Sequence, residues 1–440
     1  MNEAGLNDKS FMAWHLHSGT SLFLNSSFDI PSTAPAAETL DVTVRRSYAT
    51  LLGYLAPRAG GDLATVEDAL SEALLAAVQQ WPAQGIPDKP EAWLLAVARR
   101  RLTDEQRRHA VRERFSATMQ HALESAEQIA VSSDEFPDER LKLLFVCAHP
   151  AIDEAMRTPL MLQTVLGLDA QAIASDFLVA PAAMAQRLVR TKAKIKAAAI
   201  PFEVPERCDW DERFCFVLDA IYAAFTRGWQ SSPEDETGHD MACEAIRLGD
   251  VAVTLVPEEP EALGLLALML HCHARRSARM DASGRYVPLD EQDPAAWDHP
   301  MIDRAEKLLQ TAGAMNKPGR FQVEAAIQSA HAQRRVTGRV EWPIVAALYQ
   351  WLMTFTPALG ARIGHAIATA HASSAEQGWM LLESLPKERL ADHQPYWAAR
   401  AHLLAQTGRA IEAKAAFERA IGLCADPALR AYLWERRNTI

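Results

Sequence analysis

The chain has 440 residues, of which 49% are hydrophobic and 23% are charged, the balance of an ordinary soluble globular protein. This composition excludes a mostly disordered or collagen-like chain, and no stretch reaches the ~18 consecutive apolar residues of a membrane span. The 45 basic and 56 acidic residues give a net charge of −11, which excludes a protein that coats nucleic acid over its whole surface. A nucleic-acid site would be a local basic patch on an acidic body.

The predicted elements are almost all helices. From about residue 40 onward, apolar residues recur at helical spacing and no segment alternates for long with a period of two, so we predict an all-α fold. Residues 1–38 are rich in Ser, Thr, Asn and Pro and are expected to form a flexible extension. Two small helical domains are expected at 39–115 and 139–202, joined by an acidic linker at 116–138. A helical domain follows at 203–440.

The first element with a clear face is the helix predicted over Val66–Trp81. Its apolar residues share one side and its acidic residues the other; they are Leu70, Ala73, Leu74, Ala77 and Val78, against Glu67, Asp68 and Glu72. Such an amphipathic helix is typical of core packing. Docking of a partner is the alternative.

The next predicted helix begins at Pro90 and runs to Arg108, with an apolar first half around Trp93. Its second half is dense in arginine: residues 90–115 carry seven arginines and four acids. Arginine clustered beside an aromatic residue suits contact with phosphates and unstacked bases. A surface helix with internal ion pairs is the other interpretation of this pattern alone.

Two short helices follow the linker. Asp169 is placed to cap a helix over 170–178, and Pro181 suits the first turn of a second helix whose buried residues are Met184, Leu188 and Ile195. The second helix carries five basic residues up to residue 199 and no acid; they are Arg187, Arg190, Lys192, Lys194 and Lys196. This arrangement is typical of a helix-turn-helix, whose second helix enters the major groove. Ala182, Ala183 and Gln186 would then lie near bases, and four of the cations near phosphates: Arg187, Arg190, Lys192 and Lys194. The alternative is a solvated basic face on an ordinary helical hairpin.

The C-terminal part carries small and aromatic residues at tetratricopeptide offsets: Trp397, Ala401, Leu404, Gly408, Ala413, Phe417 and Ala420. Stacked helical pairs leave a concave face for a partner. The domain would dock onto the N-terminal domains or onto another protein, or it would be purely structural.

We expect no enzyme, metal or cofactor. The six cysteines include no C-x-x-C pair, which indicates a reducing cytoplasm rather than disulfides or structural zinc. Adjacent helical residues such as His271 and Cys272 point about 100° apart and do not converge on one ion. Cys147 and His149 have no evident acid partner, so a buried turn is expected there.

Taken together, these segments resemble an extracytoplasmic-function sigma factor of a subgroup with a tetratricopeptide-like C-terminal extension. The resemblance runs from about residue 40 to the C-terminus and rests on the order of its motifs: Asp68–Ala73, Trp93–Arg101, Leu141–Pro150, Ile173–Val179, Met184–Arg190, Pro201–Pro205 and Leu289–Asp293. It implies a cytoplasmic, non-enzymatic protein that binds core RNA polymerase and promoter DNA. Domains 39–115 and 139–202 would be sigma regions 2 and 4.

The resemblance also implies roles for individual residues. Polymerase docking would involve Asp68, Leu70, Glu72 and Leu74. The downstream promoter element would be melted and held by Trp93, Arg99, Arg100, Arg101, Arg107 and Arg108. The upstream element would be contacted by Gln186, Arg187, Arg190, Lys192 and Lys194. Contact between the C-terminal domain and the sigma domains is expected as one means of regulation.

Two other functions stay open. The first is a helical protein-interaction scaffold whose sigma-like half no longer acts on DNA. The second is a helix-turn-helix regulator that acts without polymerase, which the net charge of −11 disfavours because the phosphate backbone attracts basic proteins.

Overall fold

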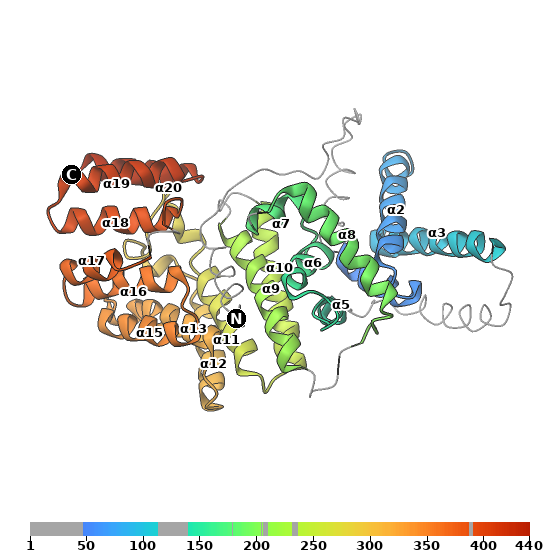
Figure 1. Ribbon diagram of the computed structural model, residues 1–440, viewed down its shortest axis with the longest axis horizontal. Helices are drawn as coiled ribbons and strands as arrows, with labels where there is room; N and C mark the ends of the chain where they lie inside the picture. The colour runs from blue at the N-terminus through green and yellow to red at the C-terminus, as the bar shows by residue number, and fades with distance from the viewer. Residues whose placement is uncertain are drawn as a thin grey trace. The chain divides into compact units, whose positions relative to one another are not determined.

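The computed structural model describes residues 47–112, 140–177, 179–203, 205, 210–230, 236–386 and 390–440. These residues form helices joined by turns, with one isolated bridge between Met280 and Tyr286 and no β-strand (Figure 1). The predicted all-α fold is confirmed. No helix in these ranges is both long and apolar enough to cross a membrane. The expected N-terminal extension at 1–38 and linker at 116–138 lie outside the described residues.

The described residues divide into two compact units. Of the described residues, those at 47–112, 140–174, 179–203, 205 and 210–217 form the N-terminal unit, and those at 175–177, 218–230, 236–386 and 390–440 form the C-terminal unit. The N-terminal unit contains a helix over 47–55, the 3-10 turn η2 (Pro57–Ala59), α2 (Leu63–Gln84), α3 (Pro90–Arg112), α5 (Arg140–Cys147), α6 (Glu154–Thr164) and α8 (Pro181–Ala197). Helices α7 (Ala170–Asp176) and α9 (Asp211–Gln230) cross the boundary along the chain.

The remaining elements form the C-terminal unit. They are α10 (Glu236–Leu255), α11 (Pro260–His273), η4 (Ser277–Arg279), η5 (Pro294–Ala296), α12 (His299–Ala314), α13 (Arg320–Ala332), α14 (Arg334–Thr337), α15 (Trp342–Phe355), α16 (Leu359–Ala372), α17 (Ala375–Glu383), α18 (Gln394–Gln406), α19 (Ala410–Leu423) and α20 (Pro427–Asn438).

Helix α2 is longer at both ends than the sequence predicted. It begins at Leu63 because Asp62 caps it: the Asp62 carboxylate accepts a hydrogen bond from the Thr65 amide at 3.2 Å. At the other end the helix continues through Pro82 and stops at Gly85, whose φ of +88° suits glycine and whose amide bonds the Trp81 carbonyl.

The core of the second half of the N-terminal unit is built around α5. All its residues except Lys142 are buried. The ring of Phe145 lies 5.5 Å from that of Trp210 and 6.0 Å from that of Phe214, measured between centroids. This aromatic cluster ties α5 to the first turn of α9, which follows α8 in the chain. Helix α8 itself contacts α2 and α6.

The C-terminal unit is a series of packed helix pairs. Helix α11 contacts α12 and α13, α15 contacts α16, and α18 contacts α19; the last two lie side by side in Figure 1. At the α18–α19 turn, Gly408 has a φ of +75°. The small residues expected between these helices are buried at 0% exposure; they are Ala401, Ala413 and Ala420. The pair has the packing that the spacing indicated, and its assignment as a tetratricopeptide repeat stays a prediction.

One group of buried charges in the C-terminal unit forms a network of ion pairs and hydrogen bonds. The Arg320 guanidinium lies 2.7 Å from Glu324 and 3.1 Å from Asp219, and the Tyr222 hydroxyl donates to Glu324 at 3.0 Å. Glu261 accepts hydrogen bonds from the backbone amides at the start of α13. These contacts connect α9, α11 and α13, and they explain why charged residues lie inside this unit.

Candidate nucleic-acid interface

The α7–α8 segment forms the two short helices that the sequence predicted. The Asp169 carboxylate accepts a hydrogen bond from the Ala172 amide at 2.6 Å, and Pro181 occupies the first turn of α8. Met184, Leu188 and Ile195 are buried at 1% exposure or less. The helix boundaries follow from these local signals, and the apolar stripe anchors one side of α8 while the opposite side is exposed.

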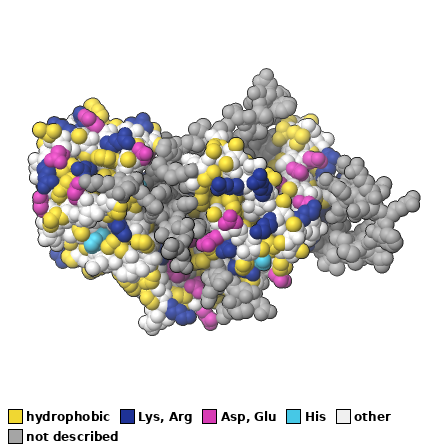
Figure 2. Space-filling view, in the orientation of Figure 1, with side chains coloured by type: hydrophobic (Ala, Val, Ile, Leu, Met, Phe, Trp, Pro, Cys, Tyr) yellow, Lys and Arg dark blue, Asp and Glu magenta, His cyan; other side chains and the backbone are white. Residues whose placement is uncertain are grey.

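The exposed surface of α8 carries Gln186, Arg187, Arg190 and Lys194. Since successive residues turn by about 100°, Gln186 lies at the centre of this surface, Arg187 and Lys194 lie on one flank, and Arg190 lies between the centre and that flank. In Figure 2, Lys and Arg side chains gather along the course of α8. A helix with long cations around an exposed face can place them against phosphates while its centre approaches base edges.

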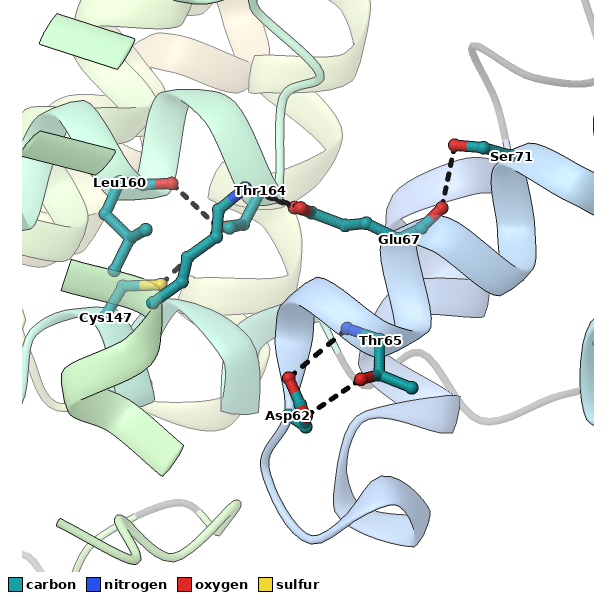
Figure 3. A network of polar contacts seen from close by, with 8 residues as sticks. Asp62, Thr65, Glu67, Ser71, Cys147, Leu160 and Thr164 are labelled. Carbon is teal, nitrogen blue, oxygen red and sulfur yellow. Dashed lines mark hydrogen bonds and ion pairs between the residues drawn. The ribbon is translucent and has the colours of Figure 1, made fainter. Parts of the chain in front are cut away.

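Lys192 differs from this group. The sequence placed it beside the exposed cations, but its side chain is buried at 8% exposure, and its ammonium lies 2.6 Å from both carboxylate oxygens of Glu67 on α2. Figure 3 shows Glu67 extending from α2 toward the elements that carry Cys147 and Thr164. The ammonium of Lys192 is already paired with a carboxylate, so in this arrangement it is not available to a phosphate. The prediction that Lys192 contacts a phosphate is wrong for this arrangement.

Lys196 makes a second ion pair between the same two helices. Its ammonium lies 2.5 Å from the carboxylate of Asp62, the residue that caps α2. Burial raises the pKa of Asp62, but hydrogen bonds from Lys196 and Thr65 outweigh this effect and hold the pKa below its usual value. Sequence reasoning missed Asp62 and Glu67 as partners. No local signal could reveal them, because they lie more than 120 residues from the two lysines along the chain.

The arginines of α3 are unequal in their availability. Arg100 is exposed. Arg99 is half-buried, donates a hydrogen bond to the Tyr54 hydroxyl and stacks over that ring at 5.0 Å from the centroid. Arg101 lies 3.2 Å from Glu72 on α2, with both side chains about half exposed. The side chains of Arg107 and Arg108 lie outside the described residues. Arg99 therefore has a structural partner that its sequence position did not indicate.

Trp93 lies near the start of α3, close to the C-terminal half of α2. Its ring is half-buried and meets that of Trp81 edge to face, with centroids 5.6 Å apart. This contact fixes the orientation of α3 on α2. The part of the indole left exposed is available to a base.

The outer face of α2 carries a second candidate surface. Asp68 and Glu72 are exposed, and Leu74 is half-buried. Leu70, in contrast, is buried at 1% exposure, so the expected contact of this residue with a polymerase is corrected to a core position. Leu75, which the sequence did not single out, is 58% exposed and shares a face with Asp68 and Glu72. In the sequence, an apolar residue at helical spacing from two acids on the acidic side of the helix was the signal that could have indicated Leu75 as part of this surface.

The residues considered for catalysis or metal binding contact neighbouring residues of the fold. The Cys147 thiol lies 3.4 Å from the Thr164 hydroxyl, and burial raises its pKa to about 12, so it is not a thiolate at neutral pH. The His149 ring accepts a hydrogen bond from the Ala151 amide. Across the described ranges no three His, Cys, Asp or Glu side chains are grouped to hold a metal ion.

His271 is a buried neutral imidazole, so it should make the stability of the C-terminal unit depend on pH. Burial, with the charges of Arg275 and Arg335, lowers its pKa to about 3. The unfolded chain, with a pKa near 6.5, takes up a proton between about pH 6.5 and 3 that the folded chain does not. Stability should therefore fall on acidification across this window, by up to ~1.4 kcal/mol per pH unit for this residue.

The matched variant is His271→Leu, since neither ring nitrogen of His271 has a hydrogen-bond partner and Nε2 lies 3.7 Å from a Glu306 carboxylate oxygen, beyond hydrogen-bond distance. We expect the difference between the denaturant midpoints at pH 7 and pH 4.5 to shrink in this variant. The exposed His299→Leu serves as the control. An unchanged pH dependence in His271→Leu would show that this imidazole is solvated.

Known proteins resemble separate parts of the chain and one resembles most of it. Residues 44–112 match sigma-70 region 2, and residues 213–313 match a family of unknown function, DUF6596. An uncharacterized protein of Rhizobium meliloti (strain 1021) is 37% identical over 380 residues, which cover 84% of this chain and 89% of that protein. No solved structure matches the chain.

Proposed function

We propose that this chain, which belongs to the same family as the Rhizobium meliloti protein and contains a sigma-70 region 2 domain, is a sigma factor of the extracytoplasmic-function type. It would bind core RNA polymerase, direct it to promoters and start transcription. The observation that carries this proposal is the match of 44–112 to region 2, followed in the same chain by α8, a helix with an exposed basic face. A sigma factor needs both a polymerase-binding domain and a second DNA-reading element.

The roles follow from the exposure of each side chain. The exposed acids Asp68 and Glu72, with Leu75, would dock on polymerase. Trp93 and Arg100 would contact the melted downstream element, with Arg107 and Arg108 beyond them. Gln186 would face base edges of the upstream duplex, and Arg187, Arg190 and Lys194 would contact phosphates. The C-terminal unit, part of which matches the family of unknown function, would regulate the sigma part or bind a partner.

The net charge of −11 fits this division of labour. An acidic chain with small basic patches is weakly attracted to DNA by itself, because non-specific affinity comes from phosphate neutralisation. Polymerase would supply the remaining affinity. The acidic net charge therefore supports a polymerase-dependent factor over a regulator that binds DNA alone.

The proposal is tested by assembling the chain with core polymerase and capturing fragments of the source genome. A sigma factor enriches a small set of fragments that core polymerase alone does not enrich. The scaffold alternative predicts co-purification of proteins and no such enrichment. Capture of the same fragments by the chain without polymerase would favour the stand-alone regulator.

A further inference from the structure

The two ion pairs between α8 and α2 hold the DNA-reading helix in a closed arrangement, and we propose that they form a self-inhibitory latch. The latch consists of Lys192 with Glu67 and Lys196 with Asp62. It opens when α8 engages promoter DNA on the polymerase. This inference rests on the proposed function, and it assigns a regulatory role to two acidic residues for which the function itself has no use.

The geometry of α8 shows what the latch withholds. At 100° per residue, Lys192 and Lys196 lie on the flank of the exposed surface opposite Arg187 and Lys194, with Gln186 between the two flanks. A helix in the major groove has a phosphate backbone on each side. In the closed arrangement the cations of one flank are free for phosphates, and the two lysines of the other flank are held by carboxylates.

The closed arrangement also places negative charge where phosphates would come. Glu67 and Asp62 lie within 2.6 Å of the lysine ammonium groups. Phosphates and these carboxylates therefore compete for the same cations, and one lysine cannot serve both. The duplex can reach the second flank only after α2 has separated from α8.

A further contact accompanies the ion pairs. The backbone of Gly61, with a φ of +81°, lies against the ring of Phe202 beyond the end of α8, close enough that a Cβ there would lie 3.2 Å from the ring. Asp62 and Gly61 are adjacent in the chain, so the start of α2 is held both by Lys196 and by Phe202. The latch therefore consists of two ion pairs and one contact between a backbone and a ring, rather than of a single pair of side chains.

The two ion pairs of the latch differ in exposure, and both can be broken. Lys196 is 60% exposed in its side chain, so solvent and salt weaken its pair. The Lys192–Glu67 pair is the stronger of the two, because the Lys192 side chain is only 9% exposed and both carboxylate oxygens of Glu67 accept from its ammonium. Removing the charge of Glu67 leaves the Lys192 ammonium buried without a counterion, which drives the side chain out toward solvent.

The first test measures the latch without DNA. The full chain is treated briefly with an acetylating reagent, and labelling of Lys192 is compared by mass spectrometry with that of exposed Lys194 in the same helix. We expect Lys192 to react at least about fivefold more slowly than Lys194 in the wild type, because an ion-paired, buried amine is protected. In Glu67→Gln with Asp62→Asn the two rates should converge; Asn retains the cap of α2. Equal rates in the wild type would overturn the latch.

The second test measures what the latch does. Binding of the full chain to a generic duplex is followed against salt, without polymerase. Freeing two lysines should strengthen binding of Glu67→Gln with Asp62→Asn about tenfold and steepen the slope of log K against log salt by about 1.8, at about 0.9 per phosphate contact. The matched control is Asp392→Asn with Glu418→Gln, which removes two exposed carboxylates paired to arginines and changes the net charge equally. An unchanged slope in the latch variant would overturn the inhibitory role.

These measurements separate the latch from the proposed function. If Lys192 is protected but the chain directs no transcription with core polymerase, the sigma assignment is wrong and the α2–α8 contact is still supported. In that case the contact has no role in promoter binding. If the chain directs transcription and Lys192 reacts as fast as Lys194, the function stands and the latch is wrong.

Discussion

Arg187→Glu with Arg190→Glu should abolish binding of the assembled holoenzyme to its promoter fragments, with at least a hundredfold loss of affinity. Both side chains are exposed on α8, and each reversal replaces a phosphate-attracting cation by a repelling anion. Losing two phosphate contacts should also reduce the salt slope of binding by about 1.8. The measurement is binding of duplex promoter fragments by holoenzyme across a salt series.

This loss should be confined to DNA. The two arginines lie away from the apolar stripe of Met184, Leu188 and Ile195, so the fold and the association with core polymerase should be unchanged. Arg339→Glu with Lys414→Glu makes the same change in net charge on exposed residues of the C-terminal unit and should retain promoter binding. Equal loss of polymerase association and DNA binding in the α8 variant would contradict the assigned role.

Asp68→Lys with Leu75→Glu should reduce association with core polymerase by more than tenfold. The two side chains are exposed one above the other on α2, and Leu75 is 58% exposed, so the change alters the surface and leaves the core intact. An exposed apolar side chain beside acids has the character of an interface centre with a charged rim. The measurement is the dissociation constant of the fluorescently labelled chain from core polymerase.

The control for this variant is Asp392→Lys with Met380→Glu. Asp392 and Met380 are exposed residues of the C-terminal unit, and Met380 is 60% exposed, so the control repeats both chemical changes. It should bind polymerase like the wild type. Tight binding by the α2 variant would move the docking surface elsewhere on the chain.

The predictable parts of the fold depend on signals within a few residues. Asp169 as a cap, Pro181 at a helix start and the apolar stripe of α8 specify two helices and their inner faces without any knowledge of the rest. The helical pair around Gly408 is similar, because a positive φ at glycine and small residues at contact positions are local requirements. Helix ends were less accurate: the cap at Asp62 starts α2 three residues before the expected Val66.

The candidate site was predicted less completely, for a physical reason. The exposed face of α8 follows from periodicity, whereas the state of each cation depends on tertiary partners. Lys192 has the same chemistry as Lys194, but only Lys192 meets Glu67, which is 125 residues away in the chain. Leu70 likewise was expected at a binding surface and is a core residue, since a helix pattern shows that a face is apolar but not what covers it.

Transcription with purified components shows whether this chain is a sigma factor. Core polymerase, the full-length chain and genomic DNA of the source organism are combined, and the start sites of the transcripts are mapped. With the wild type we expect a small set of new starts that share two separated sequence elements, and we expect these starts to be lost with Arg187→Glu and Arg190→Glu. Transcripts that start at the same positions with and without the chain would show that the chain is not a sigma factor.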